Sequence, residues 1–277
     1  MQYGKNSMNK WLLTFLSICT FTSSSFATEE RAHERVVASG IIRCAYAISP
    51  PALVKDPNSG TLSGLDYDLW NIIGTELGLK IEWTEEVGWG NFTEGLKTGR
   101  YDAFCSEIWP DPNRVKFVSL TKPILYSFLN TYVRADDHRF DGNLEKINSS
   151  LVTIPAIEGD VSVTMAQNRF PESKILSLPQ TSTVSDMFMA VMSKKADVIF
   201  LDQALFQSLN ANNKGALVQL KGVPASFTFA SYYGVNSGET QLRDMIDIAL
   251  QTLIDDGRLE KLAHKYSADY KVPRKNY

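Results

Sequence analysis

The sequence has few of the residues and motifs from which metal sites and common catalytic centres are built. Its three histidines, His33, His138 and His264, lie far apart, and no cysteine–histidine spacing suits a metal ion. It also lacks a Gly-x-Ser-x-Gly elbow, a P-loop and a dinucleotide fingerprint. We therefore expect no metal, no cofactor and no catalytic residues, which leaves binding as the leading class of function.

An excess of basic residues is missing as well. The chain has 28 Lys and Arg against 31 Asp and Glu, a formal net charge of −3 at pH 7. Proteins that bind nucleic acid need a positive field to neutralise phosphates. This balance excludes nucleic acid as an expected partner.

No apolar run long enough to span a bilayer occurs along the chain. Near the N-terminus, Lys5 and Lys10 precede the short apolar run WLLTFLSICTF, and Ser25 and Ala27 supply the small-x-small pattern of a signal-peptidase site. We interpret residues 1–27 as an export signal that is removed, rather than as a buried N-terminal helix. Loss of the two lysines leaves a net charge of −5, and we expect the mature chain to be exported and soluble.

Cysteine is scarce, with three residues in the whole chain. We expect no lipid anchor at Cys19, because Ile18 stands where such sites need a small residue. Cys44 and Cys105 fall in predicted buried strands, where a free cysteine behaves as a small hydrophobe. An exported pair that lay close together would oxidise. We nevertheless expect free thiols, because a bridge between adjacent parallel strands strains the geometry.

Strands and helices alternate through the first part of the mature chain. The runs IIRCAYAIS, LKIEW and YDAFCSEI are typical of buried strands, and the helical segments LDYDLWNIIGTEL and NFTEGLKTG lie between them. Asp66 and Asp68 stand at the start of the first helix, and we interpret both as caps or local structure. Strand–helix–strand units at this spacing predict right-handed crossovers and a parallel sheet.

A second alternating series begins after an extended crossing near Val133. It contains the strands LVTIPAI, KILSL and ADVIFL with their helices, and a second extended run, FTFASYYGVNSG, leads back to a closing helix at residues 239–256. We predict an α/β protein of two lobes, each a mainly parallel sheet flanked by helices, joined by two hinge crossings. The first lobe comprises residues 28–132 and 232–277, and the second comprises residues 133–231.

Five motifs, in order, resemble those of one family. SGLDYDLWNIIGTELGLKIEW is similar to its Gly-Phe-Asp-x-Asp-Leu segment, and GLKTGRYDAFCSEIWPDPNR to its Leu-x-x-Gly-x-x-Asp-Ala strand running into Thr-x-x-Arg. LTKP stands where the family has Phe-Ser-x-Pro. MSKKADVIFLDQ resembles its second-lobe Gly-x-x-Asp-Ala-x-x-x-Asp, and LIDDGRLEKLAHKY its C-terminal Asp-Gly-x-x-x-x-Ile-x-x-Lys-Tyr. The chain thus resembles the periplasmic solute-binding proteins of amino-acid ABC transporters, family 3, polar amino-acid group.

The resemblance implies a type II periplasmic binding fold, a clamshell that closes on one small solute. It implies a periplasmic protein that delivers an amino acid or a similar molecule to an ABC transporter permease in the inner membrane, and we expect a monomer. Arg114 matches the family's arginine that grips an α-carboxylate, and Asp202 matches the second-lobe aspartate that holds an α-ammonium. Trp89 falls where family members place a residue that packs on the ligand.

Physical chemistry is consistent with these roles but leaves alternatives open. A guanidinium fork binds a carboxylate through two charge-assisted hydrogen bonds, and an indole ring attracts a cation. Arg114 could instead start a helix and pair with Asp111. Asp202 could simply cap the helix that follows it, and Trp89 could cover the core.

The chain departs from the family pattern at places that bear on the ligand. Ser49 stands where an aromatic residue often sandwiches the ligand's side chain. Glu107 and Trp109 occupy strand-end positions that are usually small or hydroxyl-bearing. In EGDVS, Gly159 is followed by Asp160 instead of a hydroxyl residue, so Asp160 can cap its own helix and occupy the anion site itself.

These departures change the charge of the expected site. Arg114 set against Glu107, Asp160 and Asp202 gives a net charge of −2. A Glu107 that points inward favours a cationic ligand, such as a basic amino acid or an amine, whereas a solvated Glu107 has no such effect. A neutral polar amino acid is the broader expectation.

Two other functions fit the same scaffold. A few proteins that resemble these binding proteins are cyclohexadienyl dehydratases, and Glu107 in an apolar pocket beside Trp109 could have a raised pKa and serve as the general acid. The other alternative is a soluble sensing module that signals to a partner receptor. Binding without product formation separates the first alternative from solute capture.

Overall fold

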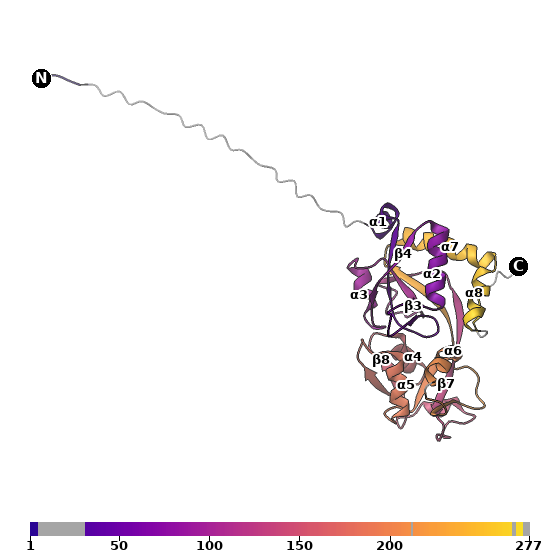
Figure 1. The fold of residues 1–277 in the computed structure, drawn as a ribbon. Coiled ribbons are helices and arrows are strands. Elements are labelled where there is room, and N and C mark those ends of the chain that lie inside the picture. Colours follow the sequence, from indigo (N-terminus) through magenta and orange to yellow (C-terminus); the bar gives the residue numbers. More distant parts are fainter. Residues whose placement is uncertain (5–30, 212, 268–269, 274–277) are drawn as a thin grey trace. The chain divides into compact units, whose positions relative to one another are not determined.

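The computed structural model describes residues 1–4, 31–211, 213–267 and 270–273 (Figure 1). Residues 31–277 form one compact unit. The predicted export signal, including Cys19, Ser25 and Ala27, lies outside the described residues apart from positions 1–4. Within the described part of the chain, no helix has the length and hydropathy that a bilayer span requires.

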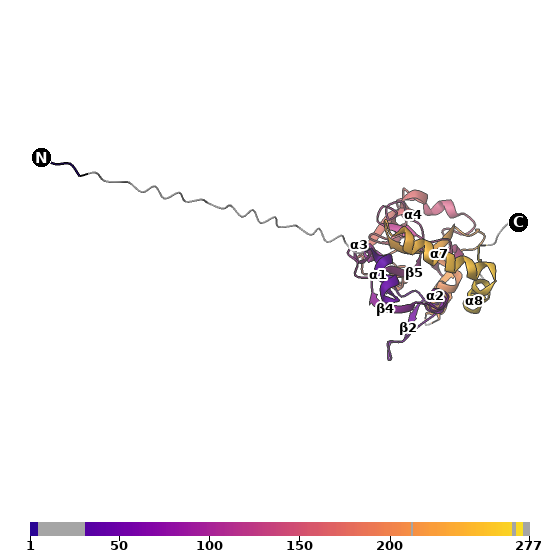
Figure 2. The same cartoon turned by 90° about the horizontal axis from the view of Figure 1, so that it is seen from above.

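Helices form where apolar residues recur at helical spacing. In the helix α2, the buried Leu65, Leu69, Trp70 and Ile73 share one face, and Gly78 ends the helix in the left-handed conformation. The predicted closing helix is α7, which packs with α8 against α2 (Figure 2). The helices are α1 (Ala32–Ser39), α2 (Leu65–Leu77), α3 (Phe92–Lys97), α4 (Val161–Arg169), α5 (Val184–Met192), α6 (Gln203–Asn210), α7 (Thr240–Asp255) and α8 (Arg258–Tyr266), with a 3-10 turn η1 (Leu144–Ile147).

The described strands form one mixed sheet and two small sheets. The large sheet has the order β10-β7-β12-β5-β1-β4, with β11 paired to β7 and β6 paired to β12. The predicted parallel pairs are present, because β1 runs parallel to β4 and β5, and β8 runs parallel to β9. The strands are β1 (Ile41–Tyr46), β2 (Val54–Lys55), β3 (Leu62–Ser63), β4 (Lys80–Glu86), β5 (Ala103–Ile108), β6 (Val118–Leu120), β7 (Leu125–Arg134), β8 (Thr153–Ile157), β9 (Lys174–Leu178), β10 (Val198–Asp202), β11 (Leu217–Gln219) and β12 (Phe227–Asn236).

The two extended crossings predicted from the sequence are the strands β7 and β12. They pair antiparallel with each other, from Leu125 opposite Ser231 to Leu129 opposite Phe227, and antiparallel with β10 and β5 on either side, so the large sheet is mixed. The lobe boundaries predicted at residues 132–133 and 231–232 fall within these two strands.

The apolar core is divided at the crossing strands. Two clusters of buried residues draw on positions up to Leu125 and from Tyr233 onward, with Ala204 as the exception. The other two clusters draw on positions 129–220. In Figure 1, α1, α2, α7 and α8 accordingly lie at one end of this unit, and α4 and α5 lie at the other.

Cys44 and Cys105 form a disulfide, which corrects our expectation of free thiols. The parallel register pairs Cys44 of β1 with Ala103 of β5, so Cys105 lies diagonally across from Cys44. This offset gives a Cα–Cα distance of 5.5 Å, within the ordinary range for a disulfide. Both cysteines are fully buried in the core. Our expectation failed because it considered only that the two strands are adjacent and not which residues of one strand lie opposite which residues of the other.

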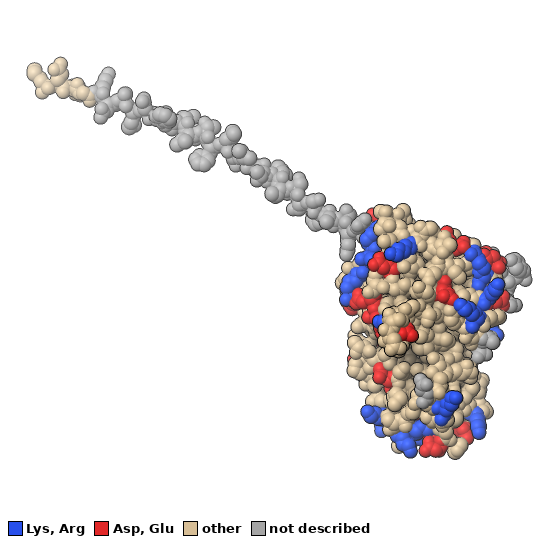
Figure 3. All heavy atoms as spheres, viewed as in Figure 1, with Lys and Arg blue, Asp and Glu red and all other residues tan. Residues whose placement is uncertain are grey.

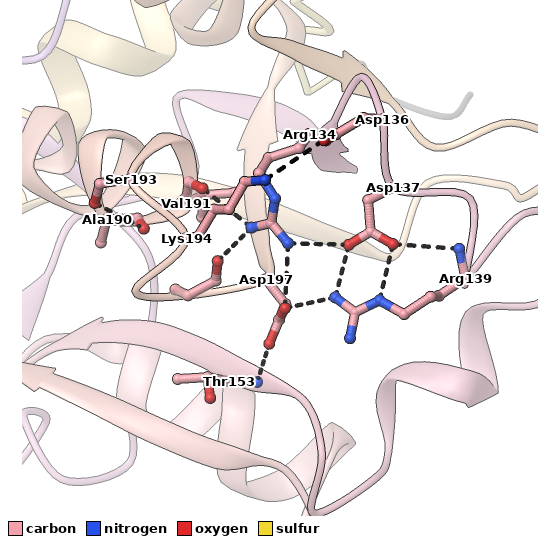
Figure 4. A network of polar contacts seen from close by, with 11 residues as sticks. Arg134, Asp136, Asp137, Arg139, Thr153, Ala190, Val191, Ser193, Lys194 and Asp197 are labelled. Atoms are coloured by element: carbon pink, nitrogen blue, oxygen red, sulfur yellow. Dashed lines mark hydrogen bonds and ion pairs between the residues drawn. The ribbon is translucent and has the colours of Figure 1, made fainter.

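A network of ion pairs holds the end of β7 (Figure 4). Arg134 pairs with Asp137 and Asp197 and donates to two main-chain carbonyls in and just after α5. Arg139 pairs with the same two aspartates, and its hydrogen bonds to Asp137 hold the pKa of that carboxyl below its usual value. The network thereby ties β7 to the loop that follows it and to the start of β10. On the face shown in Figure 3, acidic and basic side chains are interspersed.

Candidate ligand-binding site

A cavity of about 90 Å³ lies where several strands end. Its wall comes from the end of β5, from the end of β10 and from the turn after β8, and the carboxyl ends of strands are where α/β proteins bind ligands. Seven of the eight residues predicted to form the site line the cavity: Ser49, Trp89, Glu107, Trp109, Arg114, Asp160 and Asp202. The eighth, Gly159, accepts a hydrogen bond from Arg114 through its carbonyl.

Arg114 is nearly buried, with 8% of its surface exposed. Its Nε and Nη2 donate to the Gly159 carbonyl at 3.0 and 2.7 Å, and Nη2 also donates to the Trp89 carbonyl at 3.1 Å. The same Nη2 forms an ion pair with the Asp160 carboxylate at 2.9 Å. The guanidinium therefore binds the loops after β4 and β8, rather than Asp111, whose carboxylate accepts from a neighbouring main-chain amide.

Asp160 has two roles in the structure. It is the N-cap of α4, where its Oδ1 accepts a hydrogen bond from the Ser162 amide at 2.9 Å. Its Oδ2 accepts from Arg114 at 2.9 Å, and only 15% of the side chain is exposed. One carboxylate thus caps a helix and neutralises the arginine of the cavity.

The loops that Arg114 joins meet backbone to backbone. Gly159 has a φ of +75°, and a Cβ there would lie 2.7 Å from the Gly90 carbonyl oxygen. A Cβ on Gly90 would lie 2.2 Å from the Glu158 carbonyl oxygen. Side chains cannot approach main-chain atoms so closely, so this contact requires glycine on both sides.

Glu107 lies in β5 and lines the cavity. Its Oε1 is buried and has no hydrogen-bond partner among the described residues. Burial raises the pKa of Glu107 to about 7; the Ser231 hydroxyl opposes this rise, and the nearby charge of Asp202 adds to it. The structure therefore places this side chain in the inward orientation that the sequence left open.

Asp66 also lines the cavity, although we interpreted it from the sequence as a cap or local structure. It is fully buried and accepts hydrogen bonds from the Tyr233 hydroxyl at 2.8 Å and the Glu107 amide at 3.3 Å. Burial, and then the charge of Glu107, raise the pKa of Asp66 well above its usual value. The helical period contained a signal, because Asp66 shares a face with the buried Leu69 and Ile73.

Asp202 ends β10 and caps α6, where its Oδ1 accepts from the Leu205 amide at 2.9 Å. The capping role that we considered as an alternative is therefore present. The same side chain lines the cavity. The two positions are compatible, because a carboxylate can accept several hydrogen bonds.

Two indoles supply much of the apolar wall. Trp89 packs edge-on against Phe104 at 5.9 Å and contacts buried clusters from both ends of the sheet, so it covers core and lines the cavity at once. Trp109 stacks on Phe229 at 5.4 Å and packs against the cluster around β8 and α4. Ser49 brings no ring to the cavity, which the buried Tyr270 also lines.

The wall is predominantly acidic. Four carboxylates, those of Asp66, Glu107, Asp160 and Asp202, face a single basic residue, Arg114, among the described residues that line the cavity. In the described part of the chain, no three His, Cys, Asp or Glu residues are arranged to hold a metal ion. The site therefore offers acidic hydrogen-bond acceptors and aromatic surface.

Comparison with known proteins identifies relatives along nearly the whole chain. A probable amino-acid-binding protein of Bacillus subtilis (strain 168), YxeM, is 22% identical over 278 residues, covering 97% of this chain and 99% of its own. A cyclohexadienyl dehydratase of Pseudomonas aeruginosa is 22% identical over 185 residues, 67% of this chain and 68% of its own.

Solved structures share the fold. The crystal structure of the ancestral amino acid-binding protein AncCDT-1, a precursor of cyclohexadienyl dehydratase, matches with a TM-score of 0.72 at 23% identity, covering 86% of this chain and 99% of that one. This likeness confirms the predicted α/β type II binding-protein fold. The family model for bacterial extracellular solute-binding proteins, family 3, matches residues 42–269. With most of its length inside that match, the chain belongs to the family 3 bacterial extracellular solute-binding proteins.

Proposed function

We propose that this protein captures a small, positively charged organic solute in the cavity and delivers it to the permease of an ABC transporter. The family supplies the extracellular binding role, and YxeM is described as a probable amino-acid-binding protein. The observation that supports a positively charged solute is the buried Oε1 of Glu107, which has no partner among the described residues. A cationic donor gives that oxygen the hydrogen bond that a buried carboxylate requires.

The proposal includes the two lobes and the hinges. Residues 28–132 and 232–277 form the first lobe, residues 133–231 form the second, and β7 and β12 connect them. Glu107 and Trp109 then reach the solute from the first lobe, and Asp202 reaches it from the second. A solute that contacts both lobes binds the closed form better than the open form, so it shifts the molecule toward closure.

Each wall residue has a proposed part in binding. Glu107 and Asp202 accept charge-assisted hydrogen bonds from the cation, Ser49 offers a hydroxyl, and Trp89 and Trp109 give apolar and cation–π contact. Arg114, with Gly159 and Asp160, joins the facing loops of the two lobes beside the cavity.

The remaining parts of the proposal concern location and assembly. After removal of residues 1–27, the protein works in the periplasm as a monomer and meets its permease in the inner membrane. The family description supports an extracellular place of action. Detection of the processed N-terminus in a periplasmic extract by mass spectrometry tests the export step.

A thermal-shift and calorimetry panel tests the proposed solute class. The probes are arginine, lysine, agmatine and cadaverine, with glutamine and glutamate as neutral and anionic controls. A solute at 100 times its Kd adds about 2.7 kcal/mol to the free energy of unfolding. We expect stabilisation by cations and at least a tenfold loss of affinity in Glu107→Gln. Binding of glutamate or glutamine in preference to every cation would overturn the proposal.

A dehydratase is the second candidate, and one observation favours it. Glu107 has a pKa of about 7, which suits a general acid that protonates a departing hydroxyl as water and carbon dioxide leave the substrate. Against it, prephenate carries two carboxylates, and the cavity wall is acidic. Release of phenylpyruvate from prephenate, measured by its absorbance and lost in Glu107→Gln, would establish this activity.

A further inference from the structure

Both features of the cavity that could receive a ligand carboxylate are occupied by groups of the chain itself. The first is Arg114. A guanidinium presents a carboxylate with one of two paired edges, Nε with Nη2 or Nη1 with Nη2. Nη2 belongs to both edges, and it already donates to the carbonyls of Gly159 and Trp89 and to the Asp160 carboxylate. A two-point clasp of a further carboxylate would require Asp160 to leave.

The second feature is the N-terminus of α4. The main-chain amides at the start of a helix attract anions, and the carboxylate of Asp160 already accepts from the amide of Ser162. The Ser162 hydroxyl accepts from the Ile157 amide at 3.1 Å, so it is turned back toward the end of β8. Asp160 therefore satisfies the helix terminus and the arginine with one group.

The rest of the polar wall has the opposite preference. Asp66, Glu107 and Asp202 line the cavity, and no other Lys, Arg or His among the described residues does so. The pair formed by Arg114 and Asp160 cancels its own charge, so Glu107 and Asp202 set the field inside, while burial holds the pKa of Asp66 well above its usual value. A ligand carboxylate would meet like charges there, whereas an ammonium or guanidinium group meets acceptors on two sides.

We propose that the ligand of this cavity is an organic cation that carries no carboxylate, a small amine rather than an α-amino acid. This inference rests on the proposed function and names the ligand class of that site. The Asp160 carboxylate stands in for the carboxylate that an amino acid would bring, so an amine completes the site with its cationic end against Glu107 and its body against Trp89 and Trp109.

Matched pairs of ligands test the inference on the unmodified mature protein. Agmatine is arginine without its carboxylate, and cadaverine is lysine without its carboxylate. We expect each amine to bind at least tenfold more tightly than its amino acid in isothermal titration calorimetry. An amino acid that binds as tightly as its amine, or more tightly, would overturn the inference while leaving the proposed cation-binding function intact. Failure of all four cations would overturn the proposed function itself.

The variant Asp160→Asn tests the cause of the selectivity. Asparagine is as good an N-cap as aspartate, so α4 keeps its cap while Arg114 loses its anionic partner. We expect arginine and lysine to gain at least tenfold in affinity and agmatine to change by less than threefold. Glu158→Gln is the matched control, because it removes one negative charge from an exposed side chain two residues away. Unchanged affinity for both amino acids in Asp160→Asn would refute the assignment of Asp160 as the built-in carboxylate.

Discussion

At the scale of single residues, the environment of each acid matters more than its type. Asp160 and Glu107 both line the cavity, but Asp160 has a cationic partner and a helix terminus, whereas the Oε1 of Glu107 has no partner among the described residues. Burial raises the pKa of Glu107 to about 7. A carboxylate in this state gains most from a cationic ligand, and it is costly to keep ionised without one.

The raised pKa of Glu107 predicts an unusual dependence of stability on pH. Between its ordinary value of 4.5 and about 7, the folded protein holds a proton that the unfolded chain has released. The contribution of Glu107 to the free energy of unfolding therefore falls as pH rises through this window, by up to about 3 kcal/mol at 1.4 kcal/mol per pKa unit. Urea unfolding of the ligand-free protein from pH 4 to pH 8 measures it.

Glu107→Gln is the reference for that measurement, because it keeps the shape of the side chain and removes its titration. From pH 4.5 to pH 7, the free energy of unfolding of the wild type should fall relative to that of the variant. Affinity for agmatine should rise over the same range in the wild type alone, since the cation binds the ionised carboxylate. A pH-independent difference would show that Glu107 titrates normally.

At the scale of elements, two contacts hold segments together that are distant in sequence. The disulfide joins β1 to β5 across 61 residues, inside the core of the first lobe as we propose it. The glycine contact joins the loop after β4 to the turn after β8, next to Arg114. The first contact should matter for stability and the second for binding.

Removal of the disulfide should destabilise the fold without changing the site. Closing a loop of this length restricts the unfolded chain by about 4 kcal/mol in the chain-entropy description. We expect the double variant Cys44→Ala/Cys105→Ala to lose stability of that order in urea unfolding and to keep its affinity for agmatine within threefold. Equal midpoints for variant and wild type would contradict this assignment.

Gly90→Ala should have the opposite effect. Its methyl group would lie 2.2 Å from the Glu158 carbonyl oxygen, so the facing loops must separate and the closed cavity should be lost. We expect at least a tenfold loss of agmatine affinity with a small change in melting temperature. In the control Gly99→Ala, the methyl group enters open space at a φ of +66°, which should cost stability and leave affinity unchanged. Tight binding by Gly90→Ala would exclude this contact from the closed state.

At the scale of the whole molecule, the ion pair of Arg114 with Asp160 links the two proposed lobes without help from a ligand. In a protein that clasps an amino acid, the ligand's own carboxylate can supply such a link. Here the chain contributes it, so closure should be partly built in. The ligand then adds its contacts to an interface between the lobes that Arg114 and Asp160 already hold together in part.

This arrangement predicts a closed ligand-free state that depends on Asp160. By small-angle X-ray scattering, ligand-free Asp160→Asn should have a larger radius of gyration than the ligand-free wild type. A saturating concentration of agmatine should return the variant to the wild-type value, because the cation still bridges the lobes. Identical scattering of the two ligand-free proteins would mean that the ion pair does not hold the lobes together.

Much of the architecture could be predicted because the evidence for it is local. The period of apolar residues in α2 and α7 identifies helices, and their alternation with strands identifies an α/β protein. Residues that end strands or follow them are expected at the same edge of a sheet, and Glu107, Trp109 and Asp202 do meet at one cavity. The assignment of these residues as ligand contacts stays a prediction.

The sequence by itself determined the classes of element, the family and the edge of the sheet where a site would lie, because these follow from spacing along the chain. The tertiary structure decided which groups meet. The register of β1 and β5, in which Cys105 lies two residues beyond the partner of Cys44, brought the two cysteines together, and the packing of α2 buried Asp66. The partner of Arg114 depends on how closely two loops about 45 positions apart in the sequence approach each other in space, and no local sequence pattern predicts that approach.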